Sequence, residues 1–221
     1  MLSNERQLMR TEVLPADAAA IRRGSEMLAT GEVVAFPTDT VYGVGAAALD
    51  VAAVGKLFAT KVRPLGKPIA LLIAPEQDLD IVAREVPPMA RALAARFWPG
   101  GLTIIVWRSL VIPAIVAGDG PTIGLRVPDH PVALALIRAL GQPVAATSAN
   151  LFGQASPLAA EDVCCQLAGR IGLILDGGRC PGGVESTVID LTTPEPLIRR
   201  LGAVSQEAIE EALDARVRLP A

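Results

Sequence analysis

The sequence predicts a single α/β domain with a twisted sheet of parallel and antiparallel strands and helices on its faces. The chain has 221 residues, 51% of them hydrophobic, which is enough for a sizeable core in one domain. Segments with helical periodicity alternate with short apolar segments that are typical of buried strands. The last expected strands, within residues 173–199, follow one another without intervening helices. That order favours a mixed sheet over a purely parallel one.

The expected helices begin or end at recognisable residues. The first covers residues 16–30 and stops at Gly31, and the second covers residues 50–60 with Asp50 as its N-cap. Pro87 and Pro88 begin a third helix, since proline suits the first helical turn. This third helix is expected at residues 87–98, and three further helices are expected at residues 131–140, 159–168 and 205–214.

The expected strands are short apolar runs bounded by turn residues. They are predicted at residues 33–36, 69–74, 102–107, 122–127, 144–147, 173–175, 184–191 and 197–199. The chain has no low-complexity tract, repeat or linker-like stretch. We therefore expect one domain over residues 16–214, an N-terminal segment at residues 1–15, and a loosely held tail at residues 215–221.

Composition restricts the classes of protein and site that remain. No run of 18 apolar residues exists and the N-terminus has no apolar core of a secretory signal, so we expect a cytoplasmic protein without membrane contact. The net charge of −3 argues against tight general binding to nucleic acid. Three cysteines, Cys164, Cys165 and Cys180, are too few for a disulfide framework. We interpret them as packing residues and expect no protein metal site.

Two further sites are disfavoured by their surroundings. His130 stands beside Pro131, which favours a residue at the start of a helix over a member of a catalytic triad. Residues 43–48 match G-x-G-x-x-A, but residues 51–75 contain no Asp or Glu. A dinucleotide fold needs an acidic residue there for the ribose, so this interpretation is rejected.

The same acid-free stretch carries a concentration of positive charge. It contains Lys56, Lys61, Arg63 and Lys67, including every lysine of the chain. Cations favour the C-terminal end of a helix, which explains Lys56 and Lys61 as solvated side chains. It does not explain why the charges continue through residues 63–67 into a loop. A rigid loop with cations is suited to a polyphosphate or a nucleotide.

Polar residues also gather at the ends of three expected strands. They lie at residues 38–40, 147–150 and 185–187. Hydroxyls and backbone N–H groups at strand ends commonly bind phosphates or small ligands, although the same residue types also stabilise turns. Their coincidence with the basic loop favours a ligand site.

Five motifs occur in the order found in one known family. They are PTDTVYG at 37–43, KVRP at 61–64, FWPG at 97–100, SAN at 148–150 and ESTV at 185–188. On these motifs the chain resembles the YrdC/Sua5 family from about residue 20 to residue 213. The resemblance implies a YrdC-like sheet with a basic concave face. It also implies the short type of the family, without an additional C-terminal domain.

The activity implied by the resemblance is that of a threonylcarbamoyl-AMP synthase. Such an enzyme converts L-threonine, bicarbonate or CO2, and ATP into threonylcarbamoyl-AMP and pyrophosphate. The product serves the t6A modification of tRNAs that read ANN codons. Mg²⁺ is expected with ATP, and no tightly bound cofactor is expected. A downstream threonylcarbamoyl transferase complex is the expected recipient of the product, and any direct tRNA contact is expected to be weak.

The resemblance also implies roles for individual residues. Lys61 and Arg63 are expected to be catalytic. The residues expected to contact threonine are Thr40, Arg126, Ala146 through its backbone, and Ser186. Those expected to bind ATP are Arg63, Lys67, Thr122, Ser148, Asn150, Ser156 and Arg200. One departure concerns the threonine pocket, because Leu72 stands where many relatives have a histidine.

Two other functions are compatible with the same sequence. A binding module for double-stranded RNA or tRNA would use a basic face without chemistry of its own, although the sequence pI of about 5.3 weighs against it. A carbamoyl-transfer domain of the hydrogenase-maturation type would be accompanied by zinc fingers, for which this chain has no cysteine pattern.

Overall fold

A computed structural model describes residues 10–74 and 79–219 and contains one large mixed sheet. The strand order is β1-β9-β2-β3-β8-β4-β7-β6-β10-β11, and β5 pairs with β6 outside this path. The strands are β1 (Glu12–Pro15), β2 (Val34–Phe36), β3 (Gly43–Ala47), β4 (Ala70–Leu72), β5 (Ala83–Glu85), β6 (Leu102–Arg108), β7 (Thr122–Arg126), β8 (Val144–Ser148), β9 (Leu173–Asp176), β10 (Thr187–Asp190) and β11 (Leu197–Arg200).

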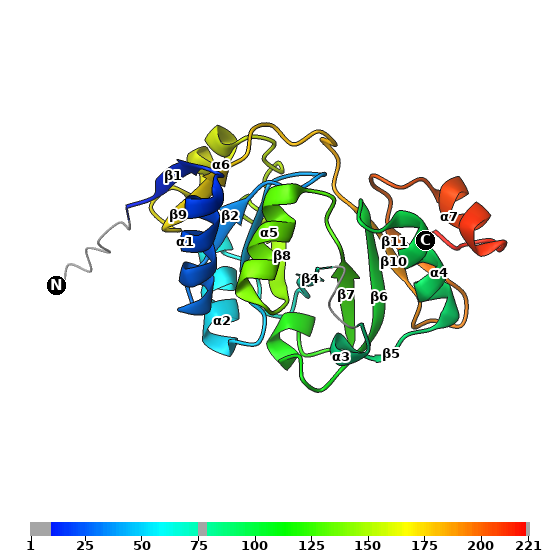
Figure 1. The fold of residues 1–221 in the computed structure, drawn as a ribbon. Helices are drawn as coiled ribbons and strands as arrows, with labels where there is room; N and C mark the ends of the chain where they lie inside the picture. The colour runs from blue at the N-terminus through cyan, green and yellow to red at the C-terminus, as the bar shows by residue number, and fades with distance from the viewer. Residues whose placement is uncertain (1–9, 75–78, 220–221) are drawn as a thin grey trace.

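The sheet is mixed, as the sequence predicts. Four pairs are parallel, namely β1 with β9, β9 with β2, β4 with β7, and β6 with β10. In the central run β2-β3-β8-β4, each adjacent pair is antiparallel. Figure 1 shows the sheet running from β1, near the N-terminus, to β10 and β11, near the C-terminus.

The helices begin at the local signals that the sequence contains. The side chain of Asp17 accepts the backbone N–H groups of α1, and Asp50 does the same for α2. Pro88 and Pro131 are the first residues of α4 and α5. The helices are α1 (Ala18–Ala29), α2 (Val51–Lys61), α3 (Leu79–Val82), α4 (Pro88–Phe97), the 3-10 helix η1 (Ala114–Ala117), α5 (Pro131–Leu140), α6 (Ala160–Leu167) and α7 (Gln206–Leu213).

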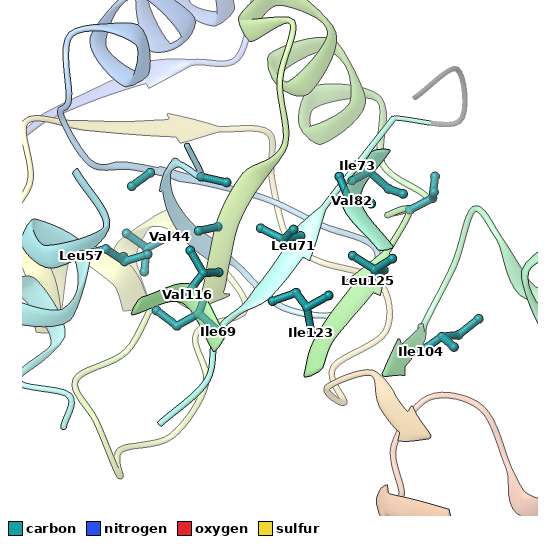
Figure 2. Close-up of a cluster of buried hydrophobic side chains, with 14 of the residues drawn as sticks. Val44, Leu57, Ile69, Leu71, Ile73, Val82, Ile104, Val116, Ile123 and Leu125 are labelled. Atoms are coloured by element: carbon teal, nitrogen blue, oxygen red, sulfur yellow. The ribbon is translucent and has the colours of Figure 1, made fainter. Parts of the chain in front are cut away.

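Two apolar clusters pack on opposite faces of the sheet. The larger one joins α2, α4, α6 and α7 to the sheet, and Figure 2 shows part of it, with Leu71, Ile104, Ile123 and Leu125 among its members. The smaller one joins α1 and α5 to β2, β4, β8 and β9, and it contains no residue of β6, β7 or β10. Because side chains alternate along a strand, the residues next to these four point to the second face. On this second face, the apolar cluster formed by α1 and α5 does not extend over β6, β7 and β10.

The structure corrects four expectations about the chain. The sheet begins with β1 at residue 12, before the expected domain boundary at residue 16. Residues 43–47 form the buried strand β3, which was not among the expected strands. The strand expected from residue 184 begins only at Thr187. The tail is not loose where it is described, since Val217 is buried and Arg218 bridges to β11.

Parts of those expectations lie outside the described residues. This applies to residues 1–9 of the N-terminal segment, to residues 75–78, and to residues 220–221 of the tail. Within the described residues, no helix combines the length and the apolar character needed to cross a membrane.

Candidate active site

A cavity of about 470 Å³ lies over the face of the sheet that α1 and α5 leave open. Its lining follows the two-residue period of the strands, with Thr103 and Ile105 from β6 and Thr122, Gly124 and Arg126 from β7. Gly124 has no side chain to project into the cavity, and a Cβ atom there would lie only 3.0 Å from the Thr103 methyl group. The sheet therefore supplies a rigid floor from which polar side chains rise.

Most of the residues singled out from the sequence line this one cavity. They are Thr40, Lys61, Arg63, Thr122, Arg126, Ala146, Ser148, Asn150, Ser186 and Arg200. Two others do not line it. Lys67 is exposed, and its carbonyl accepts a hydrogen bond from Arg63 Nε at 3.3 Å. Ser156 lies behind the lining and donates to Glu185 Oε1 at 2.7 Å.

The turn that follows β2 supplies one wall of the cavity. Thr38 Oγ1 accepts the backbone N–H groups of Thr40 and Val41, at 3.2 and 3.3 Å, and donates to the Val41 carbonyl at 2.7 Å. From the other side, the Gly182 N–H donates to the Asp39 carbonyl at 3.0 Å. A Cβ atom at residue 182 would lie 2.5 Å from that oxygen, so only glycine allows this approach.

Arg126 is almost completely buried and is held in a fixed orientation. Its Nη2 donates to Asp39 Oδ1 at 2.6 Å, its Nη1 to Thr40 Oγ1 at 3.0 Å, and its Nε to the Gly100 carbonyl at 2.9 Å. A guanidinium has five N–H groups, so one on each Nη has no partner among the described residues. These two groups suit a carboxylate, which can accept both of them.

Lys61 is the last residue of α2 and only 1% exposed. Its ammonium donates to the carbonyls of Ser148 and Asn150. Burial, together with the nearby charge of Arg63, lowers the pKa of Lys61 to about 7. Val62 follows as the C-cap, and its φ of 55° lies in the left-handed region that β-branched residues avoid. This turn directs the chain from Lys61 into the basic loop.

Arg63 lies at the edge of the cavity against an aromatic ring. Its guanidinium stands 5.4 Å from the centre of the Phe152 ring, and its Nη2 donates to the Pro68 carbonyl at 2.9 Å. Phe152 was not singled out from the sequence. The available signal was its position two residues after the SAN motif, in a chain with few aromatic residues.

A second polar network lies opposite, where β10 begins. Arg200 pairs with Glu185 and also donates to the Ser186 hydroxyl at 3.2 Å, and Thr103 Oγ1 lies 2.8 Å from the same hydroxyl. Burial raises the pKa of Glu185, but hydrogen bonds from Ser156 and the charge of Arg200 outweigh it, so the pKa lies below its ordinary value. Glu185 is therefore an ionised carboxylate inside a cationic cavity.

Thr103 was not predicted as a site residue, and Glu185 was predicted only as part of the polar segment 185–187, without a role of its own. Glu185 was visible within the EST motif, of which only the serine was interpreted as a site residue. The signal for Thr103 was one polar residue inside an otherwise apolar strand.

The residues that were interpreted as structural lie outside the cavity. His130 caps α5 by accepting the Val132 N–H at Nδ1, which confirms its assignment to a helix start. Cys180 is buried and Cys164 half-buried, but Cys165 is exposed, so the packing interpretation is wrong for Cys165. Within residues 10–74 and 79–219, no three His, Cys, Asp or Glu side chains are grouped to hold a metal ion.

This chain matches one family model and several characterised relatives. The Sua5/YciO/YrdC family model, described as "Telomere recombination", matches residues 26–202. The threonylcarbamoyl-AMP synthase of Pyrococcus abyssi is 44% identical over 87% of this chain and 57% of its own length. That of Bacillus subtilis is 43% identical over 92% of this chain and 59% of its own length.

The solved structures agree with the sequence similarity. The crystal structure of P. abyssi Sua5 complexed with L-threonine superimposes with a TM-score of 0.89, at 41% identity, over 95% of this chain and 62% of that chain. This chain therefore spans less than two thirds of these relatives.

Proposed function

The chain belongs to the Sua5/YciO/YrdC family, and from this premise we propose that it is a threonylcarbamoyl-AMP synthase. It would join L-threonine, bicarbonate or CO2, and ATP into threonylcarbamoyl-AMP and pyrophosphate, for t6A modification of tRNA. The observation that carries the proposal is the composition of the cavity. Four cations, Lys61, Arg63, Arg126 and Arg200, share its lining with hydroxyl groups. A substrate with a triphosphate and one with a carboxylate both fit this chemistry.

The threonine end of the cavity would be the one around Arg126. Its two unpartnered N–H groups would bind the carboxylate, beside the Thr40 hydroxyl. Ala146 lines the same region from the middle of β8, between Gly45 on β3 and Ala70 on β4. Leu72 also lines the cavity, so the wall that many relatives make with a histidine would be apolar here.

The ATP end would be the one around Lys61 and Arg63. Their charges would face the phosphates, together with Ser148 at the end of β8 and Asn150 just beyond it, whose carbonyls hold Lys61. Arg200, at the end of β11, would complete this binding surface. It donates to the hydroxyl of Ser186, which would contact the threonine. Thr122 lines the cavity from β7, whereas Ser156 would act indirectly, by holding Glu185. Lys67 would reach the phosphates only from the exposed loop.

The proposed reaction needs no covalent nucleophile from the protein. The protein would position the substrates and stabilise the negative charge that develops in the reaction. The threonine amine captures CO2, releasing a proton and forming an N-carboxylate. An oxygen of that carboxylate then attacks the α-phosphorus of ATP, and the bond to the β-phosphate breaks. Negative charge accumulates on the departing pyrophosphate, where Lys61 and Arg63 would stabilise it.

Magnesium would enter as part of the ATP substrate. Glu185 is the one carboxylate that lines the cavity in the described part of the chain, and Ser156 and Arg200 already occupy its oxygens. Mg²⁺ in nucleotide sites takes most of its ligands from phosphates and water. The residues present do not offer a dedicated metal site, so the substrate would be MgATP, and no step depends on a protein-bound ion.

The proposal is tested by measuring pyrophosphate release with each substrate omitted in turn. We expect release only when ATP, L-threonine and bicarbonate are all present. Release that does not depend on threonine would contradict a threonylcarbamoyl-AMP synthase. Dependence on carbamoyl phosphate in place of threonine and bicarbonate would instead favour a carbamoyl-transfer domain.

A further inference from the structure

Thr38 and Thr40 form a pair of buried hydroxyls in the turn that follows β2. They are 3% and 2% exposed, and their Oγ1 atoms lie 3.0 Å apart. Both side chains line the cavity. The direction of the hydrogen bond between them can be deduced by counting donors, because each hydroxyl has a single proton.

Thr38 uses its proton for the backbone. Its Oγ1 lies 2.7 Å from the Val41 carbonyl oxygen, which can only accept. Thr38 Oγ1 therefore has no proton left for Thr40, so the bond between the two hydroxyls runs from Thr40 to one lone pair of Thr38. The Thr40 and Val41 N–H groups, at 3.2 and 3.3 Å, share the other lone pair in a longer bifurcated contact. Thr40 also accepts the Arg126 Nη1–H at 3.0 Å. One lone pair of Thr40 remains, and it can only accept a hydrogen bond.

We propose that Thr38 is a positioning residue that fixes the Thr40 hydroxyl as an acceptor for the α-amino nitrogen of the amino-acid substrate. The inference rests on the proposed function, which supplies an amino acid as ligand. Arg126 and Thr40 stand side by side, one with N–H groups to donate and the other with a lone pair. An α-amino acid carries the matching pair on one carbon, a carboxylate that accepts and an amine that donates.

The arrangement also suits the chemical step. When the amine becomes an N-carboxylate, its nitrogen keeps one N–H. Thr40 can therefore accept a hydrogen bond from the same nitrogen before and after this change. A Thr40 hydroxyl that was free to rotate could instead donate to the substrate carboxylate, and the amine would then lose its fixed position.

A double-mutant cycle on the full chain tests the inference through L-threonine binding, measured by calorimetry. We expect Thr38→Val to raise the Kd about tenfold, and Thr38→Ser, which keeps the hydroxyl, to stay within about threefold. Thr40→Val should also raise the Kd about tenfold. Adding Thr38→Val to Thr40→Val should change nothing more. If the two effects multiply, Thr38 does not act through Thr40 and the inference is wrong.

The cycle separates positioning from folding. Thr38→Val also loses bonds to the turn backbone, so its Tm should fall in both backgrounds, while its effect on the Kd should appear only when Thr40 is present. Thr11→Val is a matched control, because Thr11 Oγ1 donates to the Ile171 carbonyl and accepts the Gly169 N–H outside the cavity. It should lower the Tm and leave the Kd unchanged. If Thr38→Val does not fold, Thr38→Cys replaces it, since a thiol is only a weak acceptor.

A second ligand identifies the group that Thr40 binds. L-2-aminobutyrate keeps the amine and the carboxylate of threonine but has no hydroxyl. Thr40→Val should weaken both ligands by the same factor. If only threonine is weakened, Thr40 accepts from the side-chain hydroxyl and the assignment to the amine is wrong. Pyrophosphate release by the unmodified protein is recorded in parallel, because its absence would overturn the proposed function and not only this inference.

Discussion

At the scale of single residues, the cavity is built from charges that are already partnered by fixed groups. Arg126 is held by Asp39, Thr40 and the Gly100 carbonyl, and Lys61 by two backbone carbonyls. Groups held in this way need little rearrangement when a charged ligand arrives, which is how a preorganised site stabilises developing charge. The residue identities were visible in the sequence, but these partners were not, because they come from distant segments.

The position of Arg63 leads to a first prediction. Arg63→Ala should lower kcat/KM for ATP, because it removes one of the cations expected at the phosphates. The decrease should correspond to a loss of about 2–4 kcal/mol of transition-state stabilisation. The Kd of L-threonine measured without ATP should change little. Arg91→Ala is a suitable control, since Arg91 forms an exposed pair with Asp80. Pyrophosphate release that survived Arg63→Ala unchanged would refute the assignment of this loop to ATP.

The pKa of Lys61 leads to a second prediction. With a pKa of about 7, Lys61 is mainly neutral at pH 8.5 in the protein without ATP. Neighbouring phosphates favour the charged ammonium and raise the pKa, so ATP binding at pH 8.5 should take up close to one proton. Near pH 6 the uptake should disappear, because Lys61 is then protonated in both states.

Calorimetry in buffers with different ionisation enthalpies measures this proton directly. Lys61→Met should abolish the uptake at pH 8.5. The same uptake in the Lys61→Met protein would mean that another group titrates and that the phosphates do not contact Lys61.

At the scale of helices and strands, local signals predicted most of the fold. Asp50 and Pro88 mark predicted helix starts that the structure confirms, because capping depends on a few neighbouring residues. The first helix, expected from residue 16, begins at Ala18 after the N-cap Asp17. β3 was missed because all its residues, Gly43–Ala47, are buried and small, which hides the alternation of a strand. β1 was missed because it exists only through pairing with β9, from the other end of the chain.

The C-terminal segment supports the edge strand that carries Arg200. The Ile198 N–H donates to the Arg218 carbonyl at 2.8 Å, the Arg218 N–H to the Pro196 carbonyl at 2.9 Å, and Val217 is buried. A chain ending at Asp214 should lose about 2–4 kcal/mol of unfolding free energy, from two backbone hydrogen bonds and one buried valine. Urea unfolding measures this loss. A chain ending at Arg218 serves as the control, and equal stability of the two shortened chains would contradict the role given to this segment.

At the scale of the whole molecule, helices cover one face of the sheet and only part of the other. The uncovered part, over β6, β7 and β10, is where the cavity forms. In β7, Ile123 and Leu125 belong to the larger apolar cluster (Figure 2) and alternate with Thr122, Gly124 and Arg126, which line the cavity, so this arrangement was predictable once the strand order was known. The strand order itself could not be predicted from the sequence, because it depends on long-range pairing.

The overall charge leads to a prediction about nucleic acid. The chain carries a net charge of −3, which disfavours strong general attraction to the phosphate backbone of nucleic acid. Double-stranded RNA should bind with a Kd weaker than about 1 µM at about 0.15 M salt. Fluorescence anisotropy with a labelled duplex at two salt concentrations measures this. Tighter binding without any pyrophosphate release would favour an RNA-binding module over an enzyme.

The most direct test of the central claim is the identity of the nucleotide product. ATP, L-threonine and ¹³C-labelled bicarbonate are incubated with the protein, and the nucleotides are analysed at once by mass spectrometry. The proposed reaction predicts an adenylate that contains threonine and one labelled carbon, together with one pyrophosphate for each adenylate formed. A threonyl adenylate without the label, or ADP and phosphate in place of AMP derivatives and pyrophosphate, would contradict the proposed function.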